Sequence, residues 1–156
     1  LWECCAFAVE RSSQGHRALL FSLDTPPAVN RVADYAFGEQ VRLVGYGFAP
    51  TADGLLVTLE WAAGAAPSAG INWFAHLLDA EGNILAQQDR VPAGGFIRLA
   101  DLADHDRLLD RLYFPGVADG ANLRLGWVNS ATAERLPVRD GVGQLVEEGF
   151  VLLPLH

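Results

Sequence analysis

Short stretches with a period of two, separated by Gly, Pro and Asp, constrain this chain more than any other feature. The segment 55–61, for example, reads Leu-Leu-Val-Thr-Leu-Glu-Trp, with an unbroken apolar series at its odd-numbered positions. Successive side chains of a β-strand point to opposite faces, so this period predicts a strand with one buried face. We expect strands over 17–23, 40–48, 55–61, 71–78, 84–89, 108–114, 121–128, 135–138 and 145–153.

No segment has a convincing helical period. The best candidate, 99–112, predicts a loop or a single helical turn followed by a strand. Sixteen glycines and eight prolines supply the turns that many short strands require. We therefore expect an all-β fold, an antiparallel β-sandwich of eight to ten short strands, immunoglobulin-like or jelly-roll-like, with residues 1–156 as a single domain. The expected core members include Trp61, Phe74, Leu125 and Leu136.

Composition excludes some classes of partner. The formal net charge is −8, and all eleven basic residues are Arg. An acidic surface repels phosphate backbones, so we expect no nucleic-acid binding. No apolar run approaches the ~20 residues of a membrane span, and we expect none in this chain. Cys4 and Cys5 are too few for a zinc site, and we expect them to be small, partly buried side chains without redox function.

An ordered series of motifs runs through residues 37–138. Its members are FGEQVRLVGY at 37–46, LVTLEW at 56–61, WFAHLLDAEG at 73–82, AQQD at 86–89, LGW at 125–127 and ERLPV at 134–138. This series resembles the C-terminal β-sandwich domain of bacterial, Chloroflexus-type membrane glycosyltransferases that are similar to protein mannosyltransferases.

The resemblance implies where the domain is located in the cell and which part of the parent protein is catalytic. The sandwich, with its core at 37–153, would lie in the cell envelope, outside the cytoplasmic membrane. Residues 1–36 would be N-terminal strands or the tail of a preceding domain. Catalysis would belong to the membrane part of a parent glycosyltransferase, so the domain itself is expected not to be an enzyme. Gln88 stands where the family usually has His, and 102–106 replaces a Trp-Pro-Gly-acidic stretch, whereas Asp110 still matches.

His76 and Asp89 are the residues most suggestive of chemistry. The hairpin formed by 71–78 and 84–89 places them within reach of each other. A His–Asp pair can make structural hydrogen bonds, bind a metal or serve as a general base. No nucleophile is signalled nearby, so structural hydrogen bonding is favoured, and the metal-binding or hydrolytic use of the pair is the alternative.

Three further groups are weaker candidates. Asp101, Asp104 and Asp106, with His105 and Asp110, form an acidic series that could hold calcium, although a solvated loop is favoured. Otherwise no metal or cofactor is expected. Among the tryptophans, Trp61 and Trp127 are expected in the core, and Trp2 and Trp73 are expected to be exposed and able to stack on sugar rings. Arg135 would pair with an acidic neighbour at the surface, or alternatively bind a glycan or a phosphate.

These observations give three functional expectations. The first is a non-catalytic accessory sandwich that binds a glycan or a neighbouring envelope protein, with Trp73, His76, Asp89, Asp110 and Arg135 as candidate ligand-binding residues. The second is a structural or interaction module with no small-molecule ligand. The third is a metal-binding or hydrolytic protein that uses His76 and Asp89.

Overall fold

The computed structural model describes residues 6–13, 16–22, 28–65, 70–91, 99–103, 106–117 and 120–156, the first two segments as backbone only. Strands dominate the fold and one short 3₁₀ turn, η2 (Leu99–Asp101), is described. The strands are β1 (Ala6–Ser13), β2 (His16–Ser22), β3 (Arg31–Phe37), β4 (Val41–Thr51), β5 (Gly54–Ala63), β6 (Ile71–Leu78), β7 (Ile84–Arg90), β8 (Arg107–Pro115), β9 (Asn122–Asn129), β10 (Val138–Asp140), β11 (Leu145–Val146) and β12 (Val151–Pro154).

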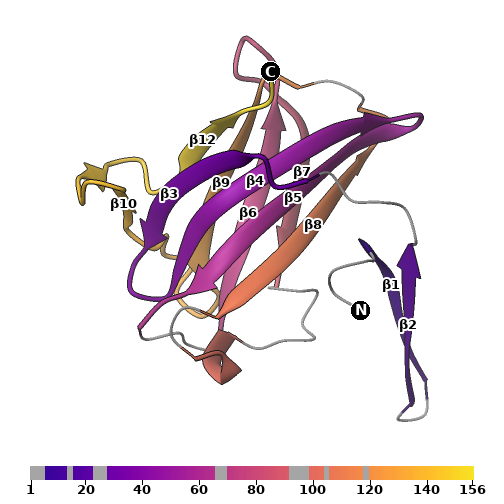
Figure 1. Ribbon diagram of the computed structural model, residues 1–156, viewed down its shortest axis with the longest axis horizontal. Helices are drawn as coiled ribbons and strands as arrows, with labels where there is room; N and C mark the ends of the chain where they lie inside the picture. The colour runs from indigo at the N-terminus through magenta and orange to yellow at the C-terminus, as the bar shows by residue number, and fades with distance from the viewer. Residues whose placement is uncertain are drawn as a thin grey trace.

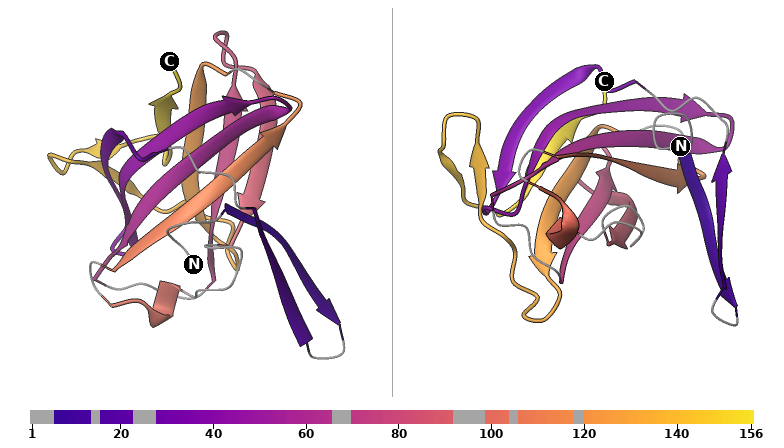
Figure 2. Two further views of the ribbon diagram at one scale, coloured as in Figure 1. Left: turned by 45° about the vertical axis from the view of Figure 1, so that its right-hand side comes forward. Right: turned by 60° about the horizontal axis from the view of Figure 1, so that its bottom comes forward.

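Ten of these strands form two antiparallel sheets that pack face to face (Figure 1). The larger sheet has the order β11-β10-β3-β4-β5-β8, and the smaller has the order β12-β9-β6-β7. β1 and β2 pair only with each other, as a separate hairpin that extends beside the sandwich (Figure 2). This arrangement confirms the predicted all-β sandwich. In the described part of the chain, no helix is long and apolar enough to cross a membrane.

Four segments differ from the predicted strands. β1 was not predicted, and the strand predicted over 135–138 is β10, at Val138–Asp140. β3 was not predicted, because its register shifts between Val32 and Tyr35 and the shift breaks the alternation. The single strand predicted over 145–153 is two strands in different sheets, β11 and β12. Gly149, with a φ of 67°, lies between them. A positive φ costs glycine little, so the chain turns there and crosses from one sheet to the other.

The core is built around tryptophan. Trp61, Trp73 and Trp127 have no exposed surface, and Trp61 on the larger sheet meets Trp127 on the smaller one edge to face, with ring centroids 5.1 Å apart. Phe37 contacts the other side of Trp61 at 5.8 Å, again edge to face. Such contacts between perpendicular rings add to the stabilisation from burying their large apolar area. The prediction of Trp61 and Trp127 as core residues is confirmed.

The prediction that Trp73 is exposed is wrong. On β6, Trp73 shares its face with Ile71, Ala75 and Leu77, all of which point into the core. Its indole nitrogen donates a hydrogen bond of 2.9 Å to Oδ2 of Asp110 on β8, in the other sheet. Asp110 is only 5% exposed, and among the described residues it and Thr58 are the only buried polar or charged side chains. One buried polar contact therefore joins the two sheets through the core.

Side chains also join the sheets at both open edges of the sandwich. At one edge, Nε2 of Gln88 on β7 donates a hydrogen bond to the carbonyl oxygen of Tyr113 on β8. At the other, the hydroxyl of Tyr46 on β4 donates to the carbonyl oxygen of Pro154 on β12, at 3.1 Å. Arg31 on β3 donates to the same carbonyl at 3.3 Å. The edges where the two sheets meet are thus tied by hydrogen bonds to backbone.

We predict that Trp73→Phe destabilises the fold more than Trp127→Phe does. Both substitutions shrink a fully buried indole to a phenyl ring, but only the first also removes a hydrogen bond to a buried carboxyl oxygen. Nε1 of Trp127 has no hydrogen-bond partner among the described residues. Loss of a donor to a buried polar group costs about 1–3 kcal/mol, so the free energies of unfolding should differ by about that amount. Urea denaturation of both variants measures it, and equal losses would contradict the role given to the bond.

Candidate functional site

The outer face of the smaller sheet carries a cluster of aromatic and charged side chains. Because Trp73, Ala75 and Leu77 point inward, Phe74 and His76 on β6 point outward. The strand register places Gly126 and Asp89 on either side of Phe74, and Arg124 and Gln87 on either side of His76. We call the following six residues the outer-face cluster: Phe74, His76, Asp89, Arg124, Arg135 and Phe150.

Gly126 makes room for Phe74. A Cβ atom at this position would overlap the Phe74 ring and would lie 3.1 Å from the carbonyl oxygen of Gly149. The absence of a side chain at Gly126 on β9 therefore leaves space for the phenyl ring of Phe74. This packing, with Arg135 above the ring, leaves Phe74 only 7% exposed although it faces outward.

Arg135 lies over two aromatic rings. Its guanidinium carbon is 5.5 Å from the centroid of Phe74 and 5.6 Å from that of Phe150. Its Nη1 donates a hydrogen bond of 3.0 Å to the carbonyl oxygen of Glu148. Arg135 reaches this position because its backbone bridges Val128 at the end of β9. Cation–π contacts and a backbone acceptor thus fix the guanidinium group above the sheet.

Arg124 binds His76 directly. Its Nε and Nη2 atoms lie 3.2 Å and 2.6 Å from Nδ1 of His76, and its guanidinium carbon is 5.5 Å from the Phe150 centroid. A guanidinium group has only donors, so Nδ1 must be the acceptor. His76 is therefore the neutral tautomer that carries its proton on Nε2. The ring of Phe74 lies 5.3 Å from the imidazole and supports it from one side.

The electrostatics at His76 agree with this arrangement. Partial burial lowers the pKa of His76 from its usual 6.5, and the positive charges of Arg124 and Arg135 lower it further. The carboxylate of Asp89 acts in the opposite direction but does not cancel these effects. Burial is thus the main cause of the lowered pKa, and the two guanidinium groups together outweigh the carboxylate of Asp89.

The five candidate ligand-binding residues fall into two groups. His76, Asp89 and Arg135 come together in the outer-face cluster, although Asp89 lies diagonally from His76 and directly opposite Phe74. Trp73 and Asp110 are buried and bonded to each other, so neither is available on that face. Sequence reasoning missed Arg124 and Phe150. Arg124 interrupts an apolar series on β9, which was a signal for an outward-facing charge, but the pairing of β9 with β6 was not predictable.

The described members of the acidic series do not lie together. Asp101 is exposed on η2, Asp106 accepts a hydrogen bond from the backbone N–H of Ala103, and Asp110 points into the core. Over the segments that the structure describes, no three His, Cys, Asp or Glu side chains are grouped as metal ligands would be. The predictions for Trp2, Cys4, Cys5, Asp104 and His105 lie outside the described residues.

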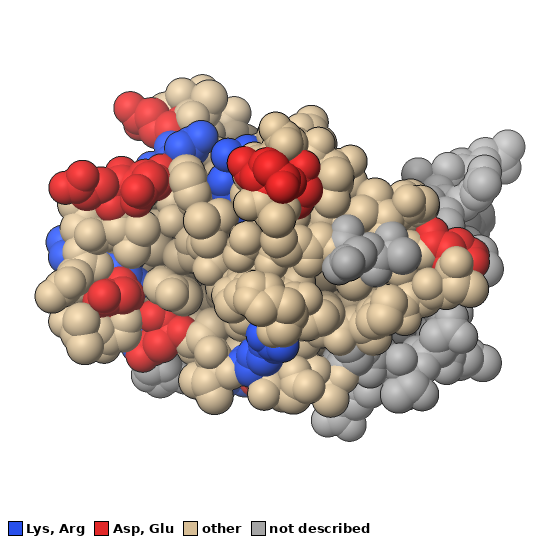
Figure 3. Space-filling view, turned by 90° about the horizontal axis from the view of Figure 1, so that it is seen from above, with Lys and Arg blue, Asp and Glu red and all other residues tan. Residues whose placement is uncertain are grey.

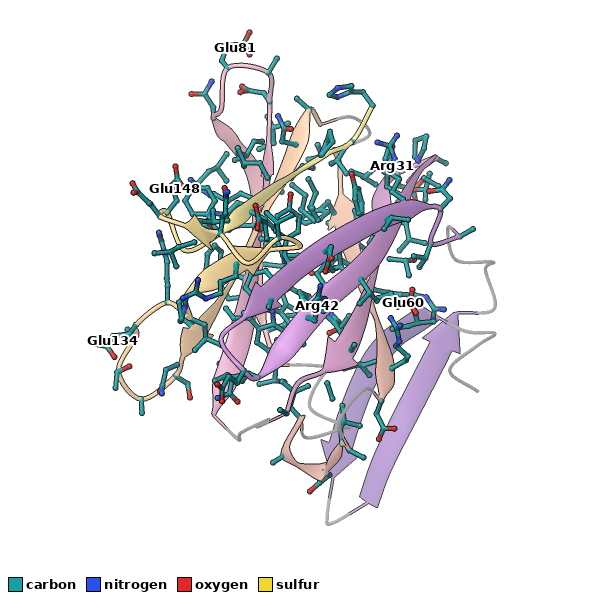
Figure 4. All side chains as sticks on the ribbon, turned by 60° about the vertical axis from the view of Figure 1, so that its left-hand side comes forward. Arg31, Arg42, Glu60, Glu81, Glu134 and Glu148 are labelled. Carbon is teal, nitrogen blue, oxygen red and sulfur yellow. The ribbon has the colours of Figure 1, made fainter. Side chains whose placement is uncertain are left out.

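Two glutamates lie close to the outer-face cluster. Glu134, on the β9–β10 loop, and Glu148, ahead of β12, both lie on this side of the sandwich (Figure 4). Arg135 nevertheless binds the backbone carbonyl of Glu148 and not its carboxylate.

Comparisons with protein-family models, with curated proteins and with solved structures find no significant match to this chain.

We predict that Arg124→Gln raises the pKa of His76. The substitution removes a positive charge in direct contact with the imidazole, so protonation of the ring becomes easier. An NMR titration of the His76 ring protons measures the shift. Arg139→Gln is the matched control, because Arg139 lies on β10 with its Nη1 bonded to the carbonyl of Gly143. A His76 pKa that is unchanged by Arg124→Gln would contradict the contact.

Proposed function

We propose that this domain is a non-catalytic binding module of the cell envelope and that it binds a glycan through the outer-face cluster. The proposal places it outside the cytoplasmic membrane, as the accessory sandwich of a glycosyltransferase-like parent. The resemblance of residues 37–138 supports that placement, and the composition of the cluster supports the binding role.

The observation that carries the proposal is the set of fixed polar groups on one sheet face. Two guanidinium groups and the Nε2–H of His76 are donors, and the exposed carboxylate of Asp89 is an acceptor. Sugar hydroxyl groups both donate and accept hydrogen bonds, so a site for them needs both kinds of partner. Aromatic rings and neighbouring side chains hold the arginines in place, which lowers the entropy lost on binding.

The state of His76 argues against catalysis. A general base needs an unprotonated nitrogen that faces the substrate, and a metal ligand needs a lone pair. Nδ1 of His76 is occupied by Arg124, and Nε2 carries the proton. The positive field further disfavours binding of a metal cation. We therefore propose a recognition role for His76 in place of a hydrolytic or metal-binding one.

A second candidate function rests on the edge strand β7. Ile84 and Leu85 on β7 and Val91 just after it are 48%, 44% and 44% exposed. Large apolar side chains on an exposed sheet edge favour contact with another protein. This observation supports an interaction module that binds a neighbouring envelope protein and no small molecule.

The test is a glycan array of bacterial envelope oligosaccharides probed with the wild-type domain, His76→Ala and Arg42→Ala. We expect wild type to bind at least one glycan and His76→Ala to bind it about tenfold more weakly, which corresponds to about 1.4 kcal/mol. Arg42→Ala is the control, because Arg42 pairs with Asp34 on the larger sheet. Absence of binding to every glycan would contradict the proposal, as would equal weakening by both variants.

A further inference from the structure

The two arginines of the outer-face cluster differ from the arginines that pair with carboxylates. Arg42 pairs with Asp34, and Arg107 lies 3.5 Å from a carboxylate oxygen of Glu60. Among the described residues, neither Arg124 nor Arg135 has a carboxylate oxygen within 4 Å. Arg31 and Arg139 also bind carbonyl oxygens, but Arg124 and Arg135 are distinguished by lying over one shared ring, that of Phe150.

Both guanidinium groups are held against the same ring. Their central carbons lie 5.5 Å and 5.6 Å from the Phe150 centroid. Each guanidinium has five N–H donors, and the contacts to His76 and to Glu148 use only part of them. The remaining donors form a positively charged set on one face, to which the Nε2–H of His76 adds a neutral donor. This is the chemistry that recognises an oxyanion.

We infer that Arg124 and Arg135 bind the carboxylate of an acidic sugar, so that the glycan of this site carries uronic-acid-type residues. This inference rests on the proposed function and narrows its ligand class. A carboxylate is planar and accepts paired hydrogen bonds from guanidinium groups. It would neutralise the charge of the two guanidinium groups, which lie beside His76 and over Phe150.

Asp89 discriminates among anionic ligands. Its carboxylate lies on the same face and repels additional negative charge, which favours a singly charged carboxylate over a doubly charged phosphate ester. An acidic peptide such as poly-glutamate brings no hydroxyl groups to Asp89. A sugar acid brings hydroxyl groups, which Asp89 can accept hydrogen bonds from. Figure 3 shows small, separate basic patches among acidic ones on the face that it displays.

The test compares trigalacturonate with its methyl ester by isothermal titration calorimetry. The two probes share every hydroxyl group and differ in the charge of the carboxyl groups. We expect the acid to bind at least tenfold more tightly than the ester, and we expect this preference to fall with added NaCl. Arg124→Gln and Arg135→Gln should each lose most of it, whereas Arg42→Gln should retain it. Binding of the acid should also raise the pKa of His76 in an NMR titration.

The possible results of this experiment separate the carboxylate inference from the glycan proposal. Equal affinity for acid and ester would overturn the carboxylate inference and leave the glycan proposal standing. Binding of a poly-glutamate peptide but of neither sugar probe would overturn both in favour of a protein partner. No binding of sugar probe or peptide would overturn the inference outright. If an arginine variant fails to unfold cooperatively, the comparison of acid and ester on the wild-type protein still gives the answer.

Discussion

The buried hydrogen bond between Trp73 and Asp110 determines which side chains lie on the outer face of the smaller sheet. Trp73 on the smaller sheet donates to Asp110 on the larger one, in a core that is otherwise almost wholly apolar. A carboxyl group without a partner in such a core would cost several kcal/mol, so the two strands that carry these residues are held in one alignment. A shift of β6 by one residue would remove Trp73 from the core and bring Phe74 and His76 into it. The buried bond thereby fixes which side chains of β6 reach the outer face.

The strand pattern predicted most of the fold, because period two and turn residues are local properties. β6, predicted over 71–78, has those bounds in the structure, and β5 and β8 differ by a residue or two at each end. The error at Trp73 concerned the face of the strand on which its side chain lies. Once His76 is placed outside, every second residue on β6 must be outside too, and Trp73 must be inside. Phe74 was expected in the core between the sheets, and it is instead buried on the outer face, under Arg135.

The candidate site was predictable only in part, since it is assembled from strands far apart in sequence. The β6–β7 hairpin is local, and it brought His76 and Asp89 to one face as expected. Arg124 arrives on β9, through a pairing that spans 48 residues, and Phe150 arrives where the chain crosses from the larger sheet to the smaller. No local pattern specifies such pairings. The burial of Asp110 could not be predicted either, because a single Asp on a strand gives no sign that a buried indole group will bind it.

The outer-face cluster also explains why its cations are arginines held on rings. A guanidinium group over a phenyl ring keeps its edge N–H groups pointing outward while its flat face is covered, and an ammonium group cannot do both. Arg124 satisfies Nδ1 of His76 and so keeps the imidazole neutral beside a second cation. Protonation of His76 would put a third positive charge into the same small area. The cluster thus tolerates two adjacent cations because its histidine stays uncharged, and a bound anion would relieve the repulsion that remains.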